Sequence, residues 1–267
     1  MPSVTAAPVT WNPFTGRTAR DHLHVPAHTH EPSTFFIGET VDVLSLENEA
    51  ILIGVVREAL DNPAHTFLFA TANPVKMWKI IDAEAGVRDT SRIWIGATVN
   101  TQAHVDERIP ELLGIWTKNI FAYCSLRGML DLTEHMPEGE PRVEWVIASA
   151  YGRNPVHPLW LRRLRDQCVL NNTAFRFTGW GDWAENVCVG SDGVKELHVP
   201  RSLSPNYCAL HADGKIAMTM EHPYNPFDHD PRGWTVMRRT SSKDSGRALD
   251  GREWDEQPCD LNELETL

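Results

Sequence analysis

The chain has 267 residues, a length that suits one α/β domain or a domain with an extension. Its composition, 42% hydrophobic and 23% charged, is typical of a globular protein, and its net charge of −11 argues against a general nucleic-acid-binding surface, which needs clustered Lys and Arg. No apolar run approaches the roughly 20 residues of a membrane-spanning helix, and we expect no secretory signal, because the amino terminus lacks a charged start followed by an apolar core.

Short apolar runs bounded by turn residues recur along the first two thirds of the chain. Such runs are typical of strands that are covered on both faces of a sheet. The predicted strands lie near residue 10 and at residues 34–37, 65–71, 92–99, 119–125, 143–149 and 173–178.

Between most of these runs, apolar residues recur at helical spacing. Asn62-Pro63 ends the first helical segment, and Pro74 suits the start of the second. The predicted helices cover residues 47–60, 74–81, 102–115 and 158–169. Because strands and helices alternate, we predict an α/β protein with a parallel sheet, either open or closed as a barrel.

After Val187 this alternation is lost. Prolines interrupt the pattern repeatedly, and only residues 234–237 resemble a strand. We therefore predict a partial β/α barrel at residues 1–186. An irregular C-terminal extension follows at residues 187–267, packs on the barrel and ends in an acidic tail.

Parallel α/β proteins place their chemistry at the carboxyl ends of the strands. At two of these ends, aromatic and cationic residues indicate a pocket that stacks a base or nucleotide. The alternative is a closing loop at residues 179–183 whose indoles cover the mouth of the barrel. A local basic groove is a further option on the predicted helix that carries Arg162, Arg163 and Arg165. The candidate ligand-binding residues are Asn73, Asn100, Arg127, Tyr151, Arg153, Trp180 and Trp183.

Histidines gather between Asp21 and Glu31. Imidazoles two residues apart can converge on one ion, and a carboxylate supplies a hard ligand. The candidate metal ligands are His22, His24, His28 and His30. A zinc or other divalent ion here would generate hydroxide, as in metal-dependent hydrolases of the amidohydrolase type. The alternative is a solvated, His-rich loop without a metal.

The five cysteines are scattered, odd in number and never in a C-x-x-C pair. We expect free thiols in a reducing cytoplasm and no cysteine zinc site. Cys124 lies at a predicted strand end near Arg127, where it is either a reactive thiolate or a buried small hydrophobe.

Several short motifs follow one another over most of the chain. They are Trp11–Pro13 with Thr15-Gly16, Phe67–Thr71 leading to Met77, Ile93–Gly96, Asp106–Pro110, Asp131-Leu132, Trp145–Ile147, His157–Cys168, Trp180–Trp183 and Gly246–Arg252. On these motifs the chain resembles the gene product 37 / gene product 68 family of phage and prophage proteins, which is radical-SAM-like in its cysteine motif. The resemblance implies a parallel β/α barrel that is TIM-like and incomplete, as in radical-SAM enzymes.

The chain departs from that family where the chemistry would lie. The family carries three cysteines after its Trp-Asn-Pro segment, whereas this chain has Arg17, His24, and Ala27 or His28 at those places. An iron–sulfur cluster needs thiolate ligands, so we expect neither a cluster nor radical-SAM activity. Charged residues that the family carries at strand ends are also missing. Their places hold Ala72-Asn73, Cys124-Ser125, Tyr151 and Thr178.

The chain keeps the apolar motifs of the family but lacks its cluster cysteines and its charged residues at the strand ends. This pattern indicates a degenerate enzyme. Our first hypothesis is a non-catalytic phage protein that binds a small molecule, nucleic acid, or a phage or host protein in phage DNA metabolism or host takeover. The second is a metal-dependent hydrolase or lyase that uses the histidines, and the third is a structural protein of the virion. We expect no membrane partner. The expected location is the host cytoplasm, or the virion under the third hypothesis.

Overall fold

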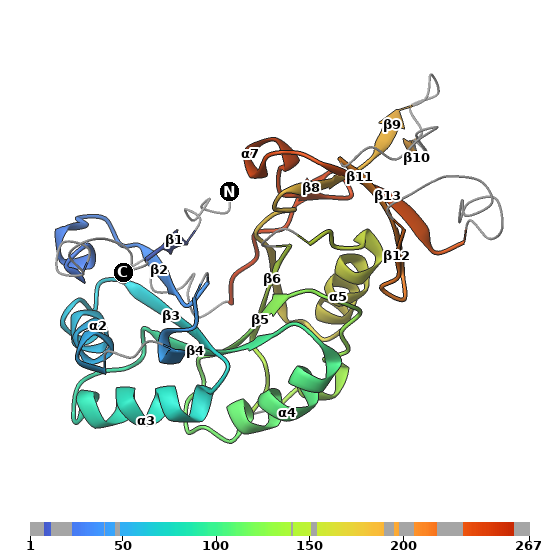
Figure 1. Cartoon of the computed structure of the whole chain (residues 1–267). Coiled ribbons are helices and arrows are strands. Elements are labelled where there is room, and N and C mark those ends of the chain that lie inside the picture. The colour runs from blue at the N-terminus through green and yellow to red at the C-terminus, as the bar shows by residue number, and fades with distance from the viewer. Residues whose placement is uncertain are drawn as a thin grey trace. The chain divides into compact units, whose positions relative to one another are not determined.

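The computed structural model describes residues 8–11, 23–39, 41–45, 49–139, 141–150, 154–189, 195–197, 206–217 and 232–258. The protein has an α/β fold whose main element is a parallel sheet of seven described strands that curls into a half-barrel (Figure 1). The strands follow one another across the sheet in chain order. They are β1 (Val9–Thr10), β2 (Thr34–Ile37), β3 (Thr66–Thr71), β4 (Ile93–Val99), β5 (Ile120–Ser125), β6 (Trp145–Ser149) and β7 (Ala174–Phe177). The predicted parallel sheet and its strands are confirmed.

Helices connect most of these strands, as the alternation of the sequence predicts. The Asn73 side chain begins α3 by accepting a hydrogen bond from the backbone N–H of Lys76 at 2.9 Å, with Pro74 in the first turn. Within the described residues, none of the helices has both the length and the apolar character needed to cross a bilayer. The α-helices of this region are α2 (Glu49–Asp61), α3 (Pro74–Ala85), α4 (Gln102–Leu113) and α5 (Pro158–Leu170), and the short 3-10 helices are η1 (Pro26–His28), η2 (Val43–Ser45) and η3 (Thr133–His135).

The chain divides into two compact units. The first comprises residues 1–99, 106–123 and 135–145. The second comprises residues 100–105, 124–134 and 146–267. The predicted boundary at residue 186 stays a prediction.

Aromatic side chains fill the concave side of the sheet in the first unit. Phe36 of β2 contacts Phe121 and Tyr123 of β5, with ring centroids 5.9 and 5.0 Å apart. Trp94 of β4 contacts Trp145 of β6 across 5.9 Å. Other strands separate the partners of each pair within the sheet, so these rings meet because the sheet curls. The inside of the half-barrel is a packed core at this level, as in closed barrels of the same winding.

The C-terminal part of the chain contains more β structure than the sequence predicts. Described strands form an antiparallel sheet in the order β12-β11-β13-β8, and β9–β10 and β14–β15 form hairpins. The prediction that only residues 234–237 form a strand here is wrong, because short antiparallel strands with one open face need no long apolar run. The elements are β8 (Trp183–Glu185), β9 (Val187–Val189), β10 (Lys195–Leu197), β11 (Tyr207–His211), β12 (Ile216–Ala217), β13 (Trp234–Arg239), α7 (Ser242–Ser245), β14 (Ala248–Leu249) and β15 (Arg252–Glu253).

Residues 246–258, here called the C-terminal strap, cover the edge of β7 in the second unit. The backbone N–H groups of Phe177 in β7 and Glu256 in the strap each donate to a carbonyl of the other segment, at 2.9 and 3.2 Å. The buried guanidinium of Arg176 forms an ion pair with Asp255 at 2.8 Å. A strand edge that is covered in this way is closed to pairing with another chain.

Candidate functional site

The loop after β5 joins the carboxyl ends of neighbouring strands in the second unit. The backbone N–H of Arg127 donates to the Asn100 carbonyl, just after β4, at 3.0 Å. The N–H of Leu126 donates to the Ser149 carbonyl, at the end of β6, at 3.3 Å. Two of the candidate ligand-binding residues, Asn100 and Arg127, therefore lie together. Residues 126–132 are called the β5 loop below.

Two glutamine side chains hold the β5 loop. Gln102, at the start of α4, accepts a hydrogen bond from the N–H of Asp131 at 2.8 Å and donates to the carbonyl of the same residue at 3.1 Å. Gln167 of α5 accepts from the N–H of Leu132 at 2.8 Å and donates to the Leu130 carbonyl at 2.9 Å. The loop is thus tied to two helices. Sequence reasoning missed both glutamines, since a polar residue on a helix carries no signal of the loop it contacts.

The β5 loop presents a cationic side chain to solvent. Arg127 is exposed and makes no side-chain hydrogen bond or ion pair with any residue that the structure describes. Arg163 of α5 is also exposed, and its Nη1 lies 3.1 Å from the Sδ of Met129 in the loop. Met129 is itself 37% exposed. Arg163 therefore contacts the loop at Met129, two residues after the exposed Arg127.

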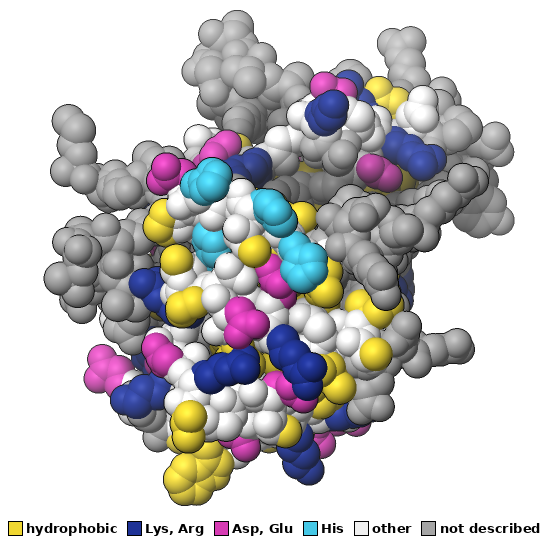
Figure 2. Space-filling view, turned by 90° about the vertical axis from the view of Figure 1, so that its left-hand side faces the viewer, with side chains coloured by type: hydrophobic (Ala, Val, Ile, Leu, Met, Phe, Trp, Pro, Cys, Tyr) yellow, Lys and Arg dark blue, Asp and Glu magenta, His cyan; other side chains and the backbone are white. Residues whose placement is uncertain are grey.

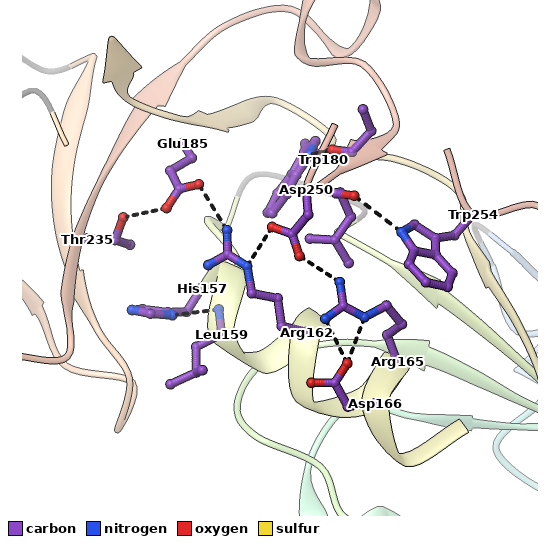
Figure 3. Close-up of polar contacts among 12 residues, drawn as sticks. His157, Leu159, Arg162, Arg165, Asp166, Trp180, Glu185, Thr235, Asp250 and Trp254 are labelled. Carbon is purple, nitrogen blue, oxygen red and sulfur yellow. Dashed lines mark hydrogen bonds and ion pairs between the residues drawn. The ribbon is translucent and has the colours of Figure 1, made fainter. Parts of the chain in front are cut away.

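The other two arginines of the predicted basic groove are already paired. Figure 3 shows Arg162 and Arg165 of α5 pointing toward Asp250 in the hairpin turn of the strap, with N–O distances of 2.8 and 2.6 Å. Burial alone would raise the pKa of Asp250, but the hydrogen bonds from Arg165 and Arg162 outweigh it and lower that pKa below its usual value. Arg165 also lies over the Trp254 ring, 5.1 Å from its centroid. These two side chains hold the strap to α5.

Asn73 lies in the first unit, where its side-chain oxygen caps α3. Next to it, the carboxylate of Asp42 accepts hydrogen bonds from the Thr71 hydroxyl at 2.8 Å and from the backbone N–H groups of Leu44 and Ala72 at 2.9 and 2.6 Å. These bonds fix the connection after β2 to the carboxyl end of β3. Asp42 was not among the sequence candidates, because a single acid in a loop does not show what it will bind.

The aromatic candidates are part of the packing of the second unit. Trp180 is buried, and its indole N–H donates to the Ala248 carbonyl of the strap at 2.9 Å. Trp183 is buried in β8, which pairs with β13. Tyr151 and Arg153 lie outside the described residues.

Three of the four candidate metal ligands lie on a surface of the first unit. His24, His28 and His30 are exposed, while His22 lies outside the described residues. Figure 2, which faces the side of the molecule where α2 lies, shows histidine side chains gathered there. In the described part of the chain, no group of three or more His, Cys, Asp or Glu side chains is arranged to hold a metal ion. The predicted metal site stays a prediction.

Burial keeps the described thiols protonated. It raises the pKa of Cys124 and of Cys168 far above the ordinary value, and that of Cys208 to about 12. A protonated thiol is a poor nucleophile. Cys124 therefore acts in the structure as a small buried hydrophobe rather than as a reactive thiolate.

One comparison with known proteins yields a match. A family model described as "Protein of unknown function (DUF5131)" matches residues 4–258 of the chain. No curated protein and no solved structure matches the chain. The matched residues include the β5 loop, the histidines between Asp21 and Glu31, and the C-terminal strap.

Proposed function

The chain belongs to the DUF5131 family, and we propose that it is a non-catalytic binding protein whose ligand carries a phosphate group and binds at the β5 loop. The observation that carries this proposal is the exposed guanidinium of Arg127. It makes no ion pair with any described residue, although it lies on a loop whose backbone is held from several sides.

Arginine is the side chain that recognises phosphate oxygens best, because its planar fork donates two parallel hydrogen bonds. Asn100, which is half-buried beside Arg127, can add an amide donor. Arg163 contributes a second positive charge, and Met129 offers an apolar contact for the rest of the ligand. Hydrogen bonds from Gln102, Gln167 and the neighbouring strand ends hold the loop, which lowers the conformational entropy lost on binding.

Binding rather than chemistry is proposed because the thiol directly before this loop is buried and protonated. Cys124, in β5 directly before the loop, is fully buried, and its pKa is raised by that burial. The resemblance to the gene product 37 / gene product 68 proteins suggests phage DNA metabolism or host takeover as the setting. A nucleotide or a single-stranded nucleic acid would supply the phosphate group in that setting.

The test is to titrate the full chain with ATP and, separately, with a short single-stranded oligonucleotide, by calorimetry or fluorescence anisotropy. We expect one of these ligands to bind and Arg127→Ala to weaken its binding by about tenfold or more, because a charge-assisted hydrogen bond is worth roughly 1.5–3 kcal/mol. Arg127→Lys should weaken binding less, since it keeps the charge and loses the fork.

The matched control is Arg88→Ala. Arg88 is 46% exposed in the first unit and pairs with Asp61, so this variant changes the net charge equally without touching the β5 loop. It should bind like the unmodified chain. If Arg127→Ala also binds both ligands unchanged, or if neither ligand binds, the proposal is wrong.

A further inference from the structure

We propose that His24 and His28 form a two-histidine site for a divalent transition-metal ion. The site lies on the turn that precedes β2 and packs against α2. It uses residues of the first unit only and does not depend on the phosphate-binding function proposed above.

The turn that carries the two imidazoles lets the His28 ring contact His24. Val25 has helical dihedral angles (φ −58°, ψ −44°), and the N–H of His28 donates to the Val25 carbonyl at 3.2 Å. The turn is a 3-10 helix, in which side chains three residues apart lie over one another, so the approach of His28 to His24 depends on the side chain of His28. The His28 ring also folds back toward its partner, because its Nδ1 lies 2.6 Å from the His24 carbonyl oxygen.

The hydrogen bonds of the two rings fix which nitrogen faces a metal. Nδ1 of His24 lies 2.8 Å from a carboxylate oxygen of Glu58, and Nδ1 of His28 bonds the His24 carbonyl. Neither a carboxylate nor a carbonyl can donate, so both Nδ1 atoms carry the proton. In the neutral rings the lone pair is then on Nε2, which is the atom that would ligate the ion.

Such Nδ1 bonds to a carboxylate or a carbonyl are what orients metal-binding histidines in proteins. Glu58 is itself held firmly, since it is 8% exposed in α2 and also accepts from the Ala27 N–H and the Asn62 amide, both at 3.3 Å. The orienting groups therefore come from the fold and do not have to be assembled by the metal.

The chemistry of the donors selects the ion. Two neutral imidazoles with water in the remaining positions suit Cu²⁺, Ni²⁺ or Zn²⁺, whereas Mg²⁺ and Ca²⁺ prefer oxygen ligands. Both rings are exposed, so an ion and its waters can reach them. The described residues offer no third side chain of the kind that would complete an all-protein site.

The test uses the full chain without a histidine tag, titrated with each metal salt by calorimetry. We expect one ion per chain, with Cu²⁺ bound most tightly, Ni²⁺ and Zn²⁺ bound more weakly, and no measurable binding of Mg²⁺. His24→Ala and His28→Ala should each weaken Cu²⁺ and Zn²⁺ binding by at least tenfold. His135→Ala, which removes a half-exposed histidine at the end of η3, should leave it unchanged.

Nitrogen-15 spectra of the histidine rings give a second readout. Zn²⁺ should shift the Nε2 signals of His24 and His28 and leave their Nδ1 atoms protonated. Glu58→Gln should weaken metal binding by roughly tenfold, because it removes the charged acceptor and keeps the shape of the side chain. Full Cu²⁺ and Zn²⁺ affinity in a folded His24→Ala/His28→Ala variant, or ligation through Nδ1, would overturn the proposal.

Discussion

Gly96 stands in the middle of β4 because the curled sheet leaves no room for a side chain there. A Cβ at this position would lie 2.3 Å from the Cζ atom of Phe121 on the next strand. The Phe121 ring in turn contacts Phe36 across the concave face. A strand glycine of this kind marks the close approach of another group rather than a turn.

We therefore expect Gly96→Ala to lower the free energy of unfolding by about 1–3 kcal/mol, since the extra methyl overpacks a filled core. Urea denaturation measures this change. The matched control is Gly128→Ala in the β5 loop, where a Cβ would have no neighbour within 4 Å, and it should stay within about 0.5 kcal/mol of the unmodified chain. Equal midpoints of urea denaturation for Gly96→Ala and Gly128→Ala would contradict the packing of Phe121 against β4.

At the scale of elements, α5 begins at a histidine that has two structural roles. Nδ1 of His157 accepts a hydrogen bond from the Leu159 N–H at 3.0 Å and caps the helix, while Nε2–H donates to the Gly233 carbonyl at 3.1 Å. The cap requires the neutral ring, because a protonated Nδ1 cannot accept a hydrogen bond, whereas the charged ring can still donate from Nε2. The pKa of His157 is lowered to about 4, chiefly by burial; the bond to Gly233 opposes this shift, and the nearby charge of Arg162 adds to it.

This pKa predicts a pH dependence of stability. The pKa is lower in the folded chain than in the unfolded chain, so the unfolded state binds the extra proton first as the pH falls. The stabilisation from His157 is complete above about pH 6.5 and is lost progressively toward about pH 4. Urea denaturation across this window should show a smaller loss for His157→Asn, which caps the helix and does not titrate. His135→Asn should keep the original pH dependence, and the same result for both variants would rule out this role of His157.

At the scale of the whole molecule, the C-terminal strap decides how the half-barrel sheet ends. A sheet that does not close into a barrel leaves an edge strand with unpaired backbone groups. The strap covers that edge at β7 and is held by Arg162 and Arg165 at its turn. Arg176, 2% exposed, points its charge at Asp255 in the strap. The guanidinium of Arg176 is therefore a buried charge that pairs with the strap.

We expect Asp255→Asn to destabilise the protein by about 3 kcal/mol, because it removes a carboxylate that pairs with the buried guanidinium of Arg176 and also with Arg247. Thermal or urea denaturation measures this loss. Adding Arg176→Met to the Asp255→Asn variant should restore part of the stability, since no buried charge then remains at this place. Glu253→Gln is the control: this carboxylate pairs with Arg247 but is 59% exposed, so its loss should cost less than about 1 kcal/mol. A cost for Asp255→Asn as small as that of the control would refute the buried pair.

The sites show where prediction from residue types succeeds and where it fails. The position of Arg127 at the carboxyl end of a strand could be predicted from the alternation of elements, while its role in binding stays a proposal. Gln102 and Gln167 could not, since their role depends on which loop the folded chain brings to them. Asn73 lies after a strand, as predicted, and its side-chain oxygen caps a helix; its role in ligand binding stays a prediction.

The sequence by itself determined the parallel strands and the helices between them, because a strand covered on both faces must be apolar along its whole length and a covering helix must repeat every three to four residues. Only the tertiary structure decided that the strands lie side by side in chain order, that the sheet curls until Phe36 meets Tyr123, and that the carboxyl-terminal residues close its edge. Those outcomes depend on contacts between residues that are distant in the chain. A local hydrophobic pattern shows that a residue will be buried. It does not show which distant residue it will contact.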